Sequence, residues 1–123
     1  MTDKIKDYLL SLGYENIYID MMPAFESAPE AVGILEWNNP RTQFSGEITH
    51  YIQMQVRSIN YDTAKAVCSD ILSAFDSGEN EALIQLNENA SCISRVRRGP
   101  LILERGSGYT TFYGEIAVWM NNE

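Results

Sequence analysis

The sequence predicts one α+β domain in which two helices pack on one face of a mostly antiparallel sheet. Two segments place apolar residues at helical spacing, and most other apolar segments alternate in polarity as half-buried strands do. The strands follow one another through turn-rich connections rather than in a regular strand–helix–strand repeat, which favours antiparallel pairing. The expected order is a helix, three strands, a second helix and four strands.

Length and composition narrow the function classes. The 123 residues have the usual size of one domain, and a hydrophobic content of 45% supplies a core, so we expect a single domain over residues 1–123. Seventeen acidic residues against nine basic ones give a net charge of −8, which opposes contact with many phosphates. We therefore expect no sequence-specific nucleic-acid binding.

Because no apolar run approaches the ~20 residues of a membrane span, and residues 1–7 lack a signal-peptide core, we expect a soluble, cytosolically synthesised protein without a membrane partner.

The first helix is predicted over residues 2–12. Thr2 is the expected N-cap and Gly13 the expected C-terminal stop. Its apolar face consists of Ile5, Tyr8, Leu9 and Leu12. Strands are expected over residues 16–20 and 31–37, separated by a loop between Pro23 and Pro29.

Residues 38–47 are rich in turn formers and predict a long exposed connection between two strands, a type of loop that is often functional. Residues 48–59 alternate in polarity and predict a long, half-buried strand. The second helix is expected over residues 62–75, with Asp62 as N-cap and Gly78 as stop. Its apolar stripe consists of Ala64, Val67, Cys68, Ile71, Leu72 and Phe75.

The last third predicts strands over residues 82–87, 91–98, 101–105 and 109–120. Gly106-Ser107-Gly108 predicts a hairpin turn rather than a phosphate-binding loop, because no helix follows it. In the final strand both faces carry bulky groups, so that either both are buried within the domain or one meets a partner. One face has Phe112, Ile116, Val118 and Met120, and the other has aromatics at Tyr109, Tyr113 and Trp119.

No catalytic or metal-binding pattern stands out. His50 is the only histidine and shares a strand face with apolar residues, which indicates a hydrogen-bonded structural histidine. Cys68 and Cys92 lack metal or redox spacing and are expected to be buried. The acidic residues Asp76, Glu79 and Glu81 are expected to be solvated. We therefore expect no enzyme activity, no cofactor and no metal.

Arginines form the one unusual charge feature. Four of the nine bases fall within eleven residues of an otherwise acidic chain, with Arg95 and Arg97 expected on one strand face and Arg98 on the other. They are either scattered surface arginines or a contact with an acidic partner, for which another copy of this acidic protein is a natural candidate. The group is Arg95, Arg97, Arg98 and Arg105.

Several segments in this order carry a resemblance to a known family: 53–57, the helix 62–75, Arg98-Gly99-Pro100-Leu101-Ile102-Leu103, Gly106-Ser107-Gly108-Tyr109, and the aromatic strand ending at Trp119. The order resembles the minor capsid or tail-terminator proteins of long-tailed bacteriophages. The resemblance implies a tail-terminator-like α+β fold in a structural virion protein of a phage or prophage. It also implies synthesis in the host bacterial cytoplasm and assembly as a ring, typically a hexamer, that joins the tail tube to head–tail connector proteins.

Two further hypotheses stay open on the residues alone. One is a ligand-binding domain with a cleft over His50 and Tyr51 beneath residues 38–47. The other is an adaptor that pairs through the edge of the aromatic strand. For assembly, the candidate contact residues are Arg41, Phe44, Arg95, Arg97, Arg98 and Arg105.

Overall fold

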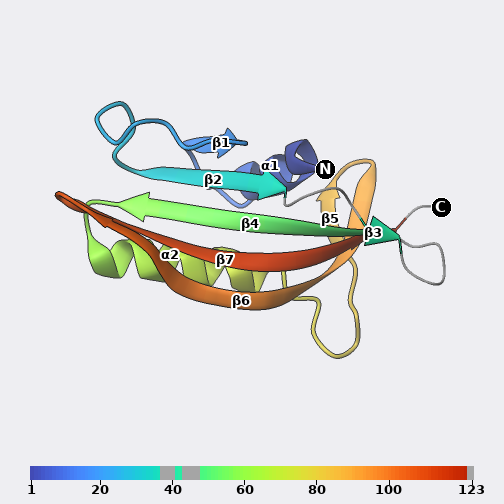
Figure 1. Cartoon of the computed structure of the whole chain (residues 1–123). Helices are drawn as coiled ribbons and strands as arrows, with labels where there is room; N and C mark the ends of the chain where they lie inside the picture. Colours follow the sequence, from blue (N-terminus) through green and yellow to red (C-terminus); the bar gives the residue numbers. More distant parts are fainter. Residues whose placement is uncertain (37–40, 43–47, 122–123) are drawn as a thin grey trace.

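A computed structural model describes residues 1–36, 41–42 and 48–121 (Figure 1). Helix α1 (Thr2–Ser11) is followed by β1 (Ile17–Ile19), β2 (Ala31–Glu36), β3 (Arg41–Thr42) and β4 (Ile48–Ser58). Helix α2 (Tyr61–Ala74) then precedes β5 (Ile84–Asn87), β6 (Ala90–Gly106) and β7 (Tyr109–Met120). The two helices and the alternating strands lie where the sequence predicts them, apart from the division of the last third.

One sheet organises the described chain, in the order β1-β2-β4-β7-β6-β5, with β3 added beside β4. All pairs are antiparallel except β1 and β2. The expected α+β class with a mostly antiparallel sheet is confirmed.

Both helices contribute to one core on one face of the sheet. Ile52 on β4 and Ile116 on β7 are paired and fully buried, and they share a core with Leu9 of α1 and Ile71 of α2. The two helices also meet directly, because the Tyr8 ring packs edge-on against Phe75 with centroids 5.2 Å apart. Burial of each such side chain stabilises the folded state by about 1.5–3 kcal/mol, and this holds the helices against this face.

The helix starts differ from the prediction. Asn60, not Asp62, is the N-cap of α2, and its side-chain oxygen accepts a hydrogen bond from the Thr63 backbone N–H at 2.9 Å. Asp62 lies in the first turn, where its charge favours the helix N-terminus. Thr2 is inside α1, whose N-cap is Met1 without a side-chain cap bond. Asn60 and Asp62 are both residue types that cap helices. The extended backbone of Asn60, which follows β4, makes Asn60 the cap.

The helix ends also differ slightly. Helix α2 ends at Ala74 with Phe75 as its C-cap, so Gly78 lies in the following turn, where φ is +76° and Asp76 accepts its backbone N–H. Helix α1 ends at Ser11, and Gly13 follows its C-cap with φ +96°.

Strand β6 is continuous where two strands were expected. It runs from Ala90 to Gly106, past Gly99 and Pro100, and its register against β7 shifts between Val96 and Arg98, between Arg98 and Leu101, and between Ile102 and Glu104. Each shift inserts extra residues opposite β7, as β-bulges do. The Gly-Pro pair therefore marks a bend inside one strand rather than a turn between two. The expected turn at Ser107 and Gly108 is confirmed.

We expect Asn60→Ala to lower the free energy of unfolding by about 1 kcal/mol, because it removes the side chain that caps α2. Thr2→Ala is the matched control and is expected to have almost no effect, because Thr2 makes no cap bond. Urea denaturation of both variants measures the difference. A larger loss for Thr2→Ala than for Asn60→Ala would contradict this capping assignment.

Candidate assembly surface

The face of the sheet away from the helices is polar yet largely covered. Gln53 on β4 and Glu115 on β7 are opposite one another and buried, and Gln55 donates a 2.7 Å side-chain hydrogen bond to Gln53. At one end of this face Trp119 donates its indole N–H to Thr49 Oγ1 at 2.8 Å. Polar side chains on this face therefore bond one another, both within β4 and between β4 and β7.

Three of the four arginines gather on this polar face. The bulge between Val96 and Arg98 sets both Arg97 and Arg98 against Glu115, so the expectation that Arg98 faces the other way is wrong. Arg98 Nε lies 3.1 Å from Glu115 Oε1, and the Arg97 guanidinium lies 4.6 Å from the centre of the Tyr51 ring. The alternation of side chains along a regular strand does not predict this arrangement. The extra residue of a bulge reverses which face each later side chain of the strand occupies.

Arg95 and Arg105 flank this group. Arg95, opposite Ala117, makes a 3.8 Å ion pair with Glu81, which is thus a partner and not merely a solvated acid. Arg105 lies towards the other face, where its guanidinium is 5.3 Å from the ring of Tyr61 at the start of α2. The structure therefore brings Arg95, Arg97 and Arg98 together and leaves Arg105 separate.

The predicted residues of the long connection are only partly described. Arg41 pairs with Thr49 through the backbone of β3, so residues 38–47 contain a short strand. Phe44 lies outside the described residues.

The outer edge of β6 is a feature that sequence analysis missed. Strand β5 pairs with β6 only as far as Cys92, and Ser77 then bonds both backbone groups of Ser94. No described strand covers the edge beyond Ser94. Leu101, Ile102 and Leu103 lie there with 45%, 42% and 45% of their surface exposed. Three consecutive apolar residues in a strand segment were the available signal, because strict alternation would have made one of them polar.

The loop before β2 contacts the β6–β7 hairpin through an aromatic stack. The ring of Phe25 stacks on Tyr109 at 4.6 Å, and the Arg57 guanidinium lies within 6 Å of both ring centres. Tyr109 also donates its hydroxyl to Glu104 at 3.1 Å, and this bond raises the pKa of Tyr109. Tyr109 and Trp119 are thus engaged within the domain, which favours intramolecular burial for this part of the aromatic face.

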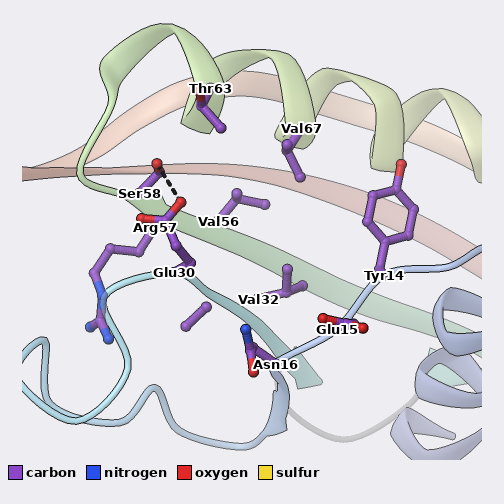
Figure 2. A pocket seen from close by; sticks show the side chains of 11 residues that line it. Tyr14, Glu15, Asn16, Glu30, Val32, Val56, Arg57, Ser58, Thr63 and Val67 are labelled. Carbon is purple, nitrogen blue, oxygen red and sulfur yellow. Dashed lines mark hydrogen bonds between the residues drawn. The ribbon is translucent and has the colours of Figure 1, made fainter.

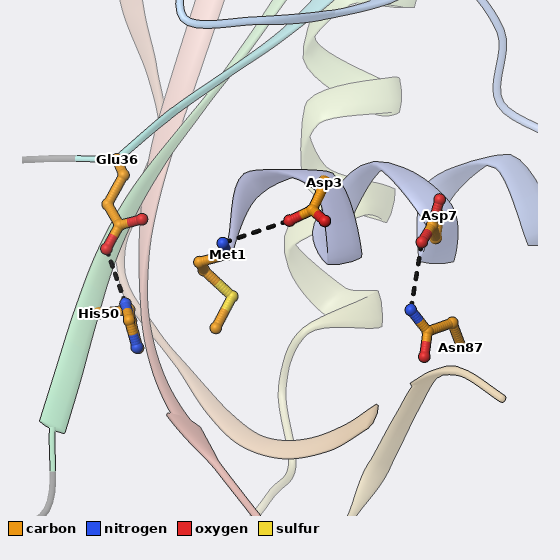
Figure 3. Close-up of polar contacts among 6 residues, drawn as sticks. All are labelled: Met1, Asp3, Asp7, Glu36, His50 and Asn87. Carbon is orange, nitrogen blue, oxygen red and sulfur yellow. Dashed lines mark hydrogen bonds and ion pairs between the residues drawn. The ribbon is translucent and has the colours of Figure 1, made fainter. Parts of the chain in front are cut away.

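His50 is a structural histidine, as expected. Figure 3 shows its Nδ1 bonded at 2.7 Å to Glu36 of the neighbouring strand β2, and it shows Asp7 of α1 accepting a bond from Asn87 of β5. Because His50 and Tyr51 are consecutive in β4, their side chains point to opposite faces. The hypothesised cleft over these residues lies beneath residues 38–47, of which only 41–42 are among the described residues.

A small cavity lies between α2 and strands β2 and β4, with a volume of about 120 Å³ (Figure 2). Its lining includes Val32, Val56 and Val67, and at its mouth Glu30 accepts a 2.6 Å hydrogen bond from Ser58. Ligand sites for drug-sized molecules have volumes of about 300–1,000 Å³, so this cavity is small by comparison. None of the candidate assembly residues lines it.

The two cysteines lie in the core. Cys68 and Cys92 are free and fully buried, as expected, and burial raises their pKa values to about 12 and about 11. Among the described residues, no group of three or more His, Cys, Asp or Glu side chains is placed to hold a metal ion. No helix in the described ranges is long and apolar enough to cross a membrane.

The fold is shared with solved structures. A virion chain of the native gene transfer agent particle aligns with 93% of this chain and 84% of its own, with a TM-score of 0.52 and 14% identity. The likeness is one of fold. Another solved chain aligns with 100% of this chain and 97% of its own at a TM-score of 0.58 and 12% identity. No protein-family model matches the sequence, and no curated protein matches it significantly.

We expect both thiols to resist alkylation at pH 8 in the folded protein, because burial disfavours the reactive thiolate. Iodoacetamide with mass spectrometry should add no label natively and two labels in 6 M guanidinium chloride. Rapid native labelling of either cysteine would show that the core around α2 and β6 opens readily.

Proposed function

We propose that this chain is a structural protein of a phage or prophage virion, of the minor capsid or tail-terminator type. It forms a ring, typically a hexamer, at the head–tail junction and contacts the tail tube and head–tail connector proteins. It is synthesised in the bacterial host cytoplasm and resides in the virion. In this role it has no enzyme activity and needs no cofactor.

The observation that supports this proposal most is the fold it shares with a chain of the gene transfer agent virion, a phage-like particle, over 93% of its length. The sequence pattern that resembles tail-terminator proteins coincides with the bent strand β6 and its hairpin. A shared fold alone permits several functions, so the assembly surface has to supply the rest of the argument.

The β6 strand supplies that surface. Its outer edge beyond Ser94 has no strand neighbour within the described chain, and it exposes three apolar side chains beside four arginines. Exposed, unpaired strand edges with apolar side chains promote association between chains. A monomeric protein has no use for such an exposed edge, whereas a ring subunit needs a surface that contacts the next subunit.

Light scattering across protein concentration, with and without Mg²⁺, tests the proposal when combined with negative-stain images. We expect closed rings with a mass near six times the 13.9 kDa of one chain. A monomer at every concentration that binds neither tail tubes nor connectors would contradict the proposal. Stabilisation of such a monomer by a metabolite would instead favour a ligand-binding domain, and a one-to-one complex with a host protein would favour an adaptor.

We expect the double charge reversal Arg95→Glu and Arg97→Glu to weaken self-association, because it replaces attraction to an acidic neighbour by repulsion. Lys65→Glu is the matched control, because it reverses an exposed charge on α2. Sedimentation velocity of both variants at equal concentration compares them. Unchanged assembly of the double variant would remove these two arginines from the interface.

A further inference from the structure

The two edge regions of the sheet, around β1 and around β6, differ in charge. Four of the nine basic residues of the chain lie on β6. By contrast, the chain from Lys6 to Arg41, which includes β1 and β2, has no lysine or arginine between these two residues. The carboxylates in that stretch are Asp7, Glu15, Asp20, Glu26, Glu30 and Glu36. Strand β1 ends the sheet on one side, and β6 is the long strand near the other, as Figure 1 shows.

On the β6 side, two positive charges are left without a carboxylate. Arg95 and Arg98 pair with Glu81 and Glu115, whereas Arg97 and Arg105 rest on tyrosine rings and have no acidic partner among the described residues. Arg97 lies on the polar face and Arg105 towards the helix face, before and after the exposed apolar run from Leu101 to Leu103. This combination of apolar centre and flanking charge is typical of a protein interface.

On the β1 side, the negative charges are equally free. Glu15 lies two residues before β1 and Asp20 directly follows it, and both are exposed without a described ion pair. Met21, next in the chain, has 69% of its surface exposed and supplies an apolar contact. The other acids of the stretch are partly engaged, since Glu36 bonds His50 and Glu30 bonds Ser58.

We propose that the β6 edge of one copy docks on the β1 edge of the next copy, with Arg97 and Arg105 facing Glu15 and Asp20. This rests on the proposed ring function and gives it a polarity. Because two different surfaces of each copy are used, the contact is heterologous, and its repetition closes into a ring when the rotation per subunit is right.

Complementary charge reversal tests this pairing. One variant has Arg97→Glu and Arg105→Glu, and the second has Glu15→Lys and Asp20→Lys. We expect each variant alone to need at least about ten times the wild-type concentration to assemble, because like charges then face each other. An equimolar mixture is expected to regain wild-type assembly, since each reversed edge meets its complement when the two variants alternate. Circular dichroism and thermal unfolding verify the fold of each, and Lys65→Glu on the exposed side of α2 is the control.

Other outcomes would overturn the inference in distinguishable ways. Wild-type assembly by both variants would place the ring contact elsewhere and leave the proposed function standing. Loss in the arginine variant with normal assembly of the Glu15/Asp20 variant would keep β6 in the contact and place its partner surface elsewhere than at β1. Impaired variants whose mixture stays impaired would also reject the pairing. A wild-type chain that never assembles would contradict the proposed function itself.

Discussion

The pairing of β4 with β7 at the centre of the sheet is the constraint on which the rest of the structure depends. It sets Ile52 opposite Ile116 and, one residue along, Gln53 opposite Glu115. Because alternate side chains face opposite sides, this register alone puts the apolar pair under the helices and the polar pair on the other face. A slip by one residue in either strand would place polar groups in the core.

The central pair also determines how α2 and β6 fit. Gly114 on β7 leaves room for Leu72 of α2, since a Cβ at Gly114 would overlap the Leu72 methyl groups. Gly99 on β6 comes close to Gly114 in turn, with φ +105°, a conformation that glycine adopts readily. The close approach coincides with the irregular part of β6, and the bulge before Gly99 puts Arg97 and Arg98 on one face. Core packing thus influences where the charged surface lies.

Most of the fold was predictable because it depends on periodicity. The alternation of residues 48–59 and 109–120 and the apolar stripe of the second helix reflect burial on one side, and burial decides the element. Features that depend on one residue of register were not predictable. The capping by Asn60 and the facing of Arg98 depend on where a strand ends or bulges, and local composition does not encode this. The outer edge of β6 lacks a strand partner because β5 is short and pairs with β6 only as far as Cys92, which depends on how the strands pair in the folded sheet.

The chain shares its fold with a virion chain, and no described strand covers the outer edge of β6 beyond Ser94. Hydrogen–deuterium exchange on assembled and dissociated protein tests this most directly, because it reports burial of backbone amides segment by segment. We predict that exchange in the segment from Val96 to Gly106 slows markedly on assembly, while exchange on the exposed side of α2 stays unchanged. Equal exchange in this segment before and after assembly would contradict the claim that the β6 edge joins the subunits.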